Sequence, residues 1–141
     1  MEIIIAIVVG IIIWVVITNK KSSAIVSSRQ GRCAYGYDIV GENSYQQNLA
    51  KIAGKKEELS KFHECTAKVT SDPLNEYDQN AVKVEINGLL VGYLNRAEAQ
   101  KLSGKTVNKT VPAVIDGGWN DSDSTGSYGV KLAVNSVDDL L

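Results

Sequence analysis

The longest uninterrupted apolar stretch of the chain lies at its start, from Ile3 to Thr18. It contains no charged residue, and as a helix with about 1.5 Å of rise per residue it would extend roughly 24 Å, close to a hydrocarbon core of about 30 Å. The stretch lacks the preceding basic segment and the small-residue cleavage site of a removable signal peptide. We therefore expect residues 1–19 to form a single transmembrane anchor.

Basic residues follow this stretch and none precedes it. They are Lys20, Lys21, Arg29 and Arg32, in a polar segment that we interpret as a tether over residues 20–34. The positive-inside rule places such a flank in the cytoplasm. The sequence thus predicts a single-pass membrane protein whose C-terminal domain faces the cytoplasm.

Beyond residue 34 the hydrophobic pattern changes to short alternating runs, which are typical of half-buried strands. The clearest run is Ala81 to Ile86. Asn87-Gly88 follows and favours a two-residue hairpin, because both positions tolerate positive φ. Leu90 to Leu94 is then the returning strand. Further strand candidates are residues 35–41, 65–69, 111–115 and 129–134.

Two segments favour short helices. Asn95 can cap a helix that begins at Arg96, with Glu98 at the third helical position, whereas residues 46–53 are ambiguous and could start a helix. Short strands with one or two small helices favour a compact barrel over a parallel sheet. We expect one mainly β domain over residues 35–136 and a C-terminal tail over residues 137–141.

Composition restricts the function more than the fold. Residues 19–141 carry 15 basic and 15 acidic side chains, whereas proteins that neutralise many phosphates usually carry a basic excess. Cys33 and Cys65 fit no zinc spacing and indicate free thiols in a reducing compartment. No metal ligands, cofactor motif, nucleophile–base pair or acidic pair stands out, so we expect no metal, no cofactor and no enzymatic activity.

Two short motifs suggest ligand sites but lack essential residues. Residues 103–106 read SGKT, yet a phosphate-binding loop needs an earlier glycine and a following helix, and here the predicted helix precedes the motif. The acidic run from Asp121 places Leu132 where a calcium loop needs a bidentate glutamate. Trp119 and Tyr128 could line a ligand groove, although packing in the core or against a hairpin is the simpler interpretation.

The segment from Asp72 to Asn80 is rich in turn residues. Pro73 fixes φ, and the Asn and Asp side chains can bond nearby backbone amides, which is enough to explain a turn. Tyr77 is not needed for a turn. An aromatic ring beside the carboxylate of Asp78 could stack on a base and bond a sugar hydroxyl.

Three segments together resemble the HIRAN domain, a small OB- or SH3-like β-barrel: VGENSYQ at 40–46, DPLNEYDQNAVKV at 72–84 and VGYLNRAEA at 91–99. The resemblance covers residues 37–134. It implies a barrel that grips the free 3′ end of single-stranded DNA, with Tyr77 packed on the terminal nucleotide and Asp78 on its 3′ hydroxyl. It also implies that Arg96 contacts phosphate and that Tyr93 occupies an adjoining position.

One departure from the HIRAN pattern lies in the first segment. DNA-binding members have an arginine and an aromatic residue after Val-Gly-x, where this chain has Asn43 and Ser44, with Tyr45 next. Losing that arginine removes a contact worth about 1–3 kcal/mol. Asn43 could bond a base, and Tyr45 could supply a stacking surface. The expected nucleic-acid-binding residues are Tyr77, Asp78, Arg96, Tyr93, Asn75, Tyr45 and Asn43.

Two functions stay open on these grounds. The first is a noncatalytic, membrane-tethered module that recognises a single-stranded DNA 3′ end, and the Tyr77–Asp78 pair favours it. The second is a HIRAN-fold interaction or scaffold module for an unknown protein partner, and the neutral charge and Asn43 favour it. A basic patch around Arg96 in the folded domain would favour DNA, whereas an acidic or apolar groove there would favour a protein partner.

Overall fold

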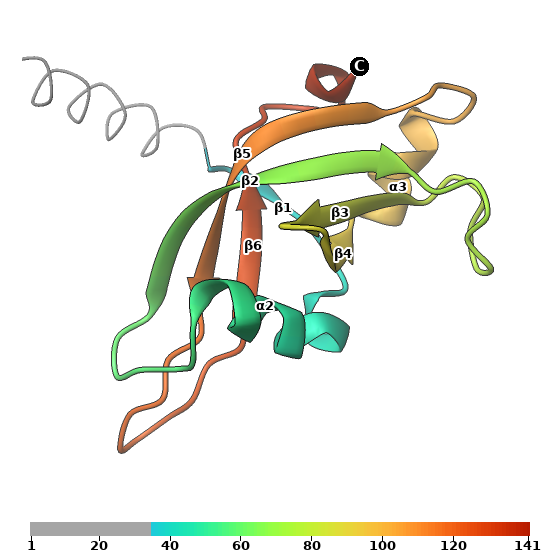
Figure 1. The fold of residues 1–141 in the computed structure, drawn as a ribbon. Coiled ribbons are helices and arrows are strands. Elements are labelled where there is room, and N and C mark those ends of the chain that lie inside the picture. Colours follow the sequence, from blue (N-terminus) through green and yellow to red (C-terminus); the bar gives the residue numbers. More distant parts are fainter. Residues whose placement is uncertain (1–34) are drawn as a thin grey trace, which may run out of the picture. The chain divides into compact units, whose positions relative to one another are not determined.

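The computed structural model describes residues 35–141, which form a curled antiparallel sheet of six strands with a few short helices (Figure 1). The strand order is β1-β6-β5-β2-β3-β4. The elements are β1 (Tyr37–Asp38), the 3-10 helix η1 (Glu42–Tyr45), α2 (Gln46–Ala53), β2 (Lys61–Ser71), β3 (Val82–Ile86), β4 (Leu89–Tyr93), α3 (Arg96–Lys101), β5 (Asn108–Gly117), β6 (Tyr128–Leu132) and the 3-10 helix η2 (Val137–Leu140). The expectation of a mainly β domain with short helices is confirmed, in the form of a curled half-barrel.

Strands β2 and β5 make the most extensive pairing of the sheet, and we call this pair the wall. Their register runs from Lys61 opposite Gly117 to Thr70 opposite Asn108. Both strands extend well beyond the predicted segments 65–69 and 111–115. The outer portions escaped prediction because their side chains are mostly exposed, so apolar alternation is missing there.

The hairpin between β3 and β4 follows the sequence prediction closely. Asn87 and Gly88 have φ of 52° and 77°, as a turn with two left-handed positions requires. The register shifts between Val84 and Glu85, which leaves one extra residue on the β4 side. Val82, Val84 and Ile86 are buried on the inner face, as the alternation predicted.

The two ends of the sheet meet at one point. Val40 follows β1 and exchanges two backbone hydrogen bonds with Tyr93 at the end of β4, at 2.8 and 2.9 Å. Gly92 permits this approach, because a Cβ there would lie 2.6 Å from the carbonyl oxygen of Val40 and 2.8 Å from Cδ1 of Ile39. We call this junction, together with α2, the seam.

Side chains of α2 occupy the open strand edges at the seam. Gln46 donates from Nε2 to the carbonyl oxygen of Tyr128 at 2.9 Å and accepts from the N–H of Tyr128 at 2.8 Å, as a neighbouring strand would. Asn48 donates to the carbonyl oxygen of Leu90 in β4 at 2.8 Å. Leu49, the residue after Asn48, is fully buried. The ambiguous segment 46–53 is therefore a helix that connects β6 with β4.

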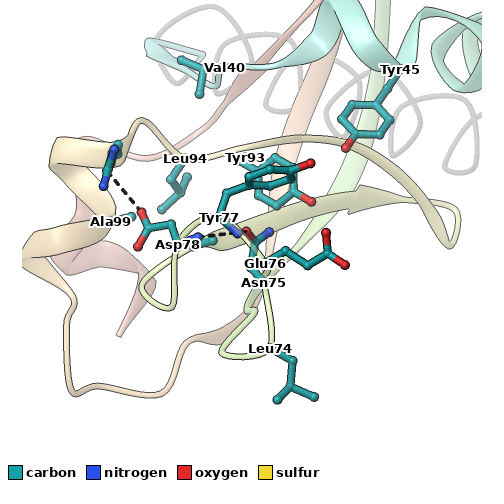
Figure 2. Close-up of a pocket in the computed structure, with 12 residues that line it drawn as sticks. Val40, Tyr45, Leu74, Asn75, Glu76, Tyr77, Asp78, Tyr93, Leu94 and Ala99 are labelled. Atoms are coloured by element: carbon teal, nitrogen blue, oxygen red, sulfur yellow. Dashed lines mark hydrogen bonds and ion pairs between the residues drawn. The ribbon is translucent and has the colours of Figure 1, made fainter.

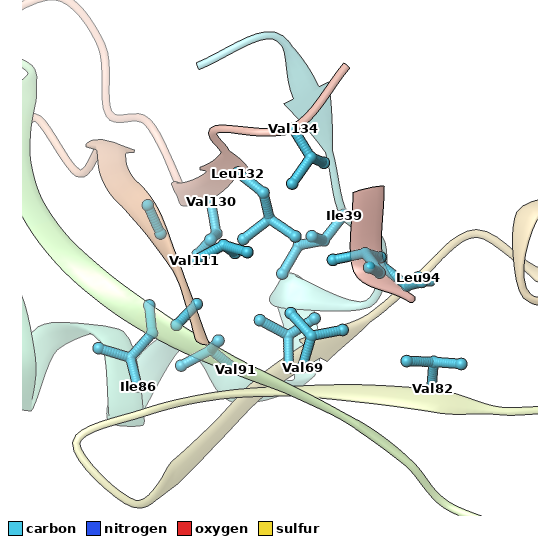
Figure 3. Close-up of a cluster of buried hydrophobic side chains, with 14 of the residues drawn as sticks. Ile39, Val69, Val82, Ile86, Val91, Leu94, Val111, Val130, Leu132 and Val134 are labelled. Carbon is cyan, nitrogen blue, oxygen red and sulfur yellow. The ribbon is translucent and has the colours of Figure 1, made fainter. Parts of the chain in front are cut away.

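One hydrophobic core fills the inside of the curl (Figure 3). Side chains from different strands meet there, including Val69 of β2, Ile86 of β3, Val91 of β4 and Leu132 of β6. These are β-branched or leucine side chains at alternating positions, which suits a pleated inner face. Burial of such side chains contributes about 1.5–3 kcal/mol each.

The C-terminal residues differ from the expected tail. Residues 137–141 include η2, whose Val137 and Leu140 are 4% and 1% exposed and join the core cluster. A capping box starts this turn: Ser136 and Asp139 bond each other's backbone N–H groups. The folded unit thus continues past residue 136 to the end of η2.

The expected anchor (1–19) and tether (20–34) lie outside the described residues. Among residues 35–141, no helix combines the length and apolarity that crossing a membrane demands.

Candidate nucleic-acid interface

A pocket with a volume of about 570 Å³ is formed by the 72–80 loop, the seam and α3 (Figure 2). Its size lies within the usual range for small-ligand sites. Six of the seven residues expected to bind nucleic acid line it: Tyr45, Asn75, Tyr77, Asp78, Tyr93 and Arg96. The fold therefore brings together residues from η1, a loop, β4 and α3.

Hydrogen bonds within the 72–80 loop fix its backbone. Asn75 accepts through Oδ1 from the N–H of Tyr77 at 2.9 Å and from the N–H of Asp78 at 3.1 Å. Asp78 accepts through Oδ1 from the N–H of Asn80 at 2.9 Å. The interpretation of this segment as a side-chain-stabilised turn is confirmed. Asn75 thus fixes the backbone positions of Tyr77 and Asp78.

Tyr77 presents its ring to solvent. The residue is 90% exposed, although it lines the pocket and lies on a backbone held by Asn75. An exposed aromatic ring on an ordered loop has no packing role in the free protein. It is available to stack on a planar ligand, which in nucleic-acid complexes contributes about 1–3 kcal/mol per base.

Asp78 and Arg96 form an ion pair at one end of the pocket (Figure 2). Oδ2 of Asp78 lies 3.7 Å from Nε of Arg96, and their side chains are 20% and 76% exposed. Arg96 is the first residue of α3, which Asn95 caps by accepting from the N–H of Ala97 at 2.9 Å. An ion pair with this much exposure contributes little to stability. A ligand could therefore contact either partner without a large cost in free energy.

Tyr45 and Tyr93 form the aromatic side of the pocket. Their ring centroids are 6.4 Å apart and the rings are inclined by 54°. Burial raises the pKa of Tyr93 to about 12, and Tyr45 and Asp72 add to this increase. Tyr93 is therefore a neutral phenol at physiological pH and can donate a hydrogen bond.

Asn43 is the expected site residue that does not line this pocket. It is exposed in η1 and belongs to a neighbouring surface hollow shared with Ser44 and Tyr45. Tyr45 lines both hollows. The position that departs from the HIRAN pattern thus lies beside the pocket, while the residues that follow the pattern line it.

Sequence reasoning missed half of the lining. The additional residues are Val40, Leu74, Glu76, Ala81, Leu94 and Ala99. Leu74 and Glu76 could have been inferred from their places beside Asn75 and Tyr77. Val40 begins the 40–46 segment that resembles the HIRAN domain, but only its long-range bridge with Tyr93 brings it to the pocket.

Charge in the pocket does not form a basic patch. Arg96 is its one cationic lining residue, and Glu76 and Asp78 also line it. Residues 35–141 carry 11 basic and 15 acidic side chains, a net charge of −4. On the charge criterion alone, a protein partner is favoured over a long stretch of DNA in this pocket.

The other candidate groups are structural in the part of the chain that the structure describes. Tyr128 is buried, and its hydroxyl donates to the carbonyl oxygen of Gly54 at 2.6 Å. Trp119 donates from Nε1 to Oγ of Ser124 at 3.0 Å within its own loop. Burial raises the pKa of the Cys65 thiol to about 11, so it is not an activated nucleophile. Within residues 35–141, no three His, Cys, Asp or Glu residues are grouped as metal ligands.

Comparisons with known proteins return no match to any family model, curated protein or solved structure.

Proposed function

We propose that the protein is a noncatalytic module that binds the 3′-terminal nucleotide of single-stranded DNA. The observation that carries this proposal is the convergence of Tyr77, Asp78, Tyr93 and Arg96 on one pocket of about 570 Å³. An exposed ring, a carboxylate acceptor and one guanidinium match a base, a sugar hydroxyl and one phosphate. We further propose that residues 1–19 anchor this module to a membrane with its binding domain in the cytoplasm.

Recognition of an end does not require a basic patch. Stacking contributes about 1–3 kcal/mol per base, and a charge-assisted hydrogen bond from a hydroxyl to Asp78 contributes about 1.5–3 kcal/mol. Only the phosphate next to the terminal sugar would meet Arg96. Salt should therefore weaken this contact little, with a slope of log K against log salt near −0.7 for one phosphate.

A second candidate is a protein-interaction module with the same fold. The net charge of −4 favours it, as does Leu74, which is 91% exposed at the rim of the pocket. An apolar side chain and tyrosines beside acidic groups also suit a peptide ligand. The two candidates differ in whether a free 3′ hydroxyl matters.

The test is fluorescence anisotropy of the full-length chain in mild non-ionic detergent, with short single-stranded DNA whose 3′ end is either free or blocked by phosphate. Binding should need the free hydroxyl. Tyr77→Ala should weaken binding about 5- to 100-fold through lost stacking, while Tyr77→Phe should bind like the wild type. Because Tyr77 is exposed, neither change should affect folding.

Asp78 provides the second pair of variants. Asp78→Asn keeps an oxygen for the N–H of Asn80 and so preserves the loop, but it removes the charge that would accept the 3′ hydroxyl. We expect Asp78→Asn to lose most discrimination between free and blocked ends. Equal binding of both ends by the wild-type protein would reject end recognition, and absence of DNA binding by the folded protein would favour the protein-interaction candidate.

A further inference from the structure

A second pocket, of about 440 Å³, lies on the other side of the 72–80 loop. It is lined by the ends of β2 and β3, the start of β5 and the turn after α3. Ala81 lines both pockets. The loop that carries Tyr77 and Asp78 therefore separates two hollows of different composition.

Eight of the fourteen residues that line the second pocket have polar side chains, and Lys105 is the one charged residue among them. Thr70, Asn80, Ser103 and Asn108 contribute hydroxyl and amide groups to the lining. The hydroxyl of Thr70 is buried and has no hydrogen-bond partner among the described residues. A hydroxyl at this position can donate a hydrogen bond to a ligand oxygen in the pocket.

One lysine of this pocket has no acidic partner. Residues 99–115 contain three lysines and no Asp or Glu. Lys101 pairs with Glu98 at 3.2 Å, whereas Lys105 is exposed and forms no salt bridge within residues 35–141. Lys109 lies opposite the buried Val69, so it belongs to the other face of the sheet from Asn108 and Thr70. Lys105 is therefore the unpaired cation of the lining.

Strand register extends this basic surface across the outer face of the sheet. Thr70 of β2 lies between Asn108 of β5 and Lys83 of β3. Two residues along β2, on the same face as Thr70, Lys68 lies between Thr110 of β5 and Glu85 of β3, and Glu85 pairs with Lys83 at 3.2 Å. Lys68 is exposed and has no salt bridge in the described part of the chain. The acidic average of the domain therefore conceals a local surface of opposite sign.

We infer that this surface, which we call the lysine face (Lys68 and Lys105 with the polar side chains of the second pocket), binds phosphates of a single-stranded nucleic acid. The strand is the one whose 3′ end enters the Tyr77 pocket, so the inference rests on the proposed function. Single strands are bound where cationic side chains follow the backbone. The aromatic pocket receives the end, and the lysine face receives phosphates farther along the strand.

The experiment measures anisotropy of the full-length chain in non-ionic detergent with strands of about 3 and about 12 nucleotides, both with free 3′ ends, between about 50 and about 200 mM salt. The long strand should bind more tightly and with a steeper salt dependence. Lys68→Ala/Lys105→Ala should reduce the slope for the long strand by about 1.4, since each lost phosphate contact contributes about 0.7. Binding of the short strand should not change.

The matched control is Lys51→Ala/Lys55→Ala. These two lysines are also exposed and unpaired within the described residues, but neither lines the pockets beside the loop. The control has the same net charge as the test variant. An equal loss of salt dependence in both double variants would show a general charge effect and overturn the inference. An unchanged slope in the Lys68/Lys105 variant would overturn it too.

End recognition and the lysine face can fail separately. If blocked and free long strands bind equally and the Lys68/Lys105 variant binds neither, the lysine face stands and the end-recognition proposal falls. If the free end is required but strand length and salt have no effect, end recognition stands and the lysine face falls.

A membrane surface is the alternative ligand for the lysine face. Its binding is measured with vesicles of neutral lipid that contain phosphatidylserine. Lysine-dependent binding to these vesicles, without lysine-dependent binding to DNA, would assign the surface to a membrane and reject our inference.

Discussion

The wall and the seam hold the same sheet together by different means. In the wall, β2 and β5 pair residue by residue from Lys61 to Thr70. At the seam, one backbone bridge at Val40 and the side-chain amides of Gln46 and Asn48 perform this role. A regular ladder leaves no hollow between its strands, whereas an incomplete one leaves room for side chains and loops.

The candidate site lies where the ladder is incomplete. Val40, Tyr45 and Tyr93 belong to the seam or its immediate continuation, and all three line the pocket. Changes at the seam should therefore alter stability and ligand binding together. Changes to the buried side chains of the wall should alter stability alone.

The largest effect should come from Gly92→Ala at the seam. The new methyl group would meet the carbonyl oxygen of Val40 at 2.6 Å, so β4 and the segment after β1 must separate. Overpacking of this kind costs about 1–3 kcal/mol, and we expect the upper end together with weaker ligand binding. Urea denaturation measures it, with Gly36→Ala as the control because that site has no neighbour within 4 Å. Equal stability of the two variants would show that the close approach of strands at the seam does not require a glycine at position 92.

Gln46→Ala should have the next largest effect. It leaves the N–H and the carbonyl oxygen of Tyr128 without their partners at 2.8 and 2.9 Å. Two lost hydrogen bonds at a partly buried edge should cost about 2 kcal/mol. Gln47→Ala changes an exposed neighbour in the same helix and should be nearly neutral. A loss for Gln46→Ala no larger than for Gln47→Ala would show that solvent replaces the side chain.

In the wall, Ile115→Val should cost about 1 kcal/mol, because one buried methyl group is lost. The pocket does not contact Ile115, so the oligonucleotide Kd should equal that of the wild type. Parallel urea denaturation and anisotropy titrations measure both quantities. A weaker Kd in this variant would mean that the wall and the seam are not independent.

The hydroxyl groups of two tyrosines should differ in their contribution to stability, by a smaller amount than the changes above. Tyr128→Phe removes the hydroxyl that donates to Gly54 at 2.6 Å and should cost about 1 kcal/mol. Tyr37→Phe removes a buried hydroxyl that has no partner among the described residues, and should leave stability unchanged or raise it slightly. Thermal unfolding of the two variants decides this, and a matching decrease for Tyr37→Phe would reveal a partner for its hydroxyl.

The smallest effect concerns alkaline pH. Burial raises the pKa of Tyr93 to about 12 from 10.0, so the folded protein holds this proton more tightly than the unfolded chain. The resulting stabilisation is fully present below pH 10.0 and is lost as pH rises toward about 12. Tyr93→Phe should therefore show a shallower fall in the free energy of unfolding over this range. Parallel slopes for variant and wild type would contradict the assignment.

The sequence predicted the elements whose signals are local. Two or three neighbouring residues are enough to predict the Asn87-Gly88 hairpin and the helix capped by Asn95. Both elements occur as predicted. The full length of β2 escaped prediction because its first residues are exposed. The end of the chain also differed, since the burial of Leu140 depends on elements far away in sequence.

The candidate site likewise contains residues that a local motif predicts and residues that only the fold brings together. Tyr77 and Asp78 belong to one motif, and the fold places Arg96 and Tyr93 beside them. Val40 joins the pocket only through the closure of the sheet, which no local pattern announces. The lysine face was hidden by the balanced total charge, because strand register rather than composition places Lys68 on the same face as Thr70 of the second pocket.

The amide of Gln46 has a consequence for the behaviour of the protein in solution. An exposed strand edge is a template on which another chain can add a strand, and this is a common start of aggregation and fibril growth. Gln46 occupies both backbone groups of Tyr128 on β6, and Asn48 occupies the carbonyl group of Leu90 on β4. The same helix that completes the sheet thus keeps these two edges from recruiting another molecule, which matters for any protein confined at high local concentration.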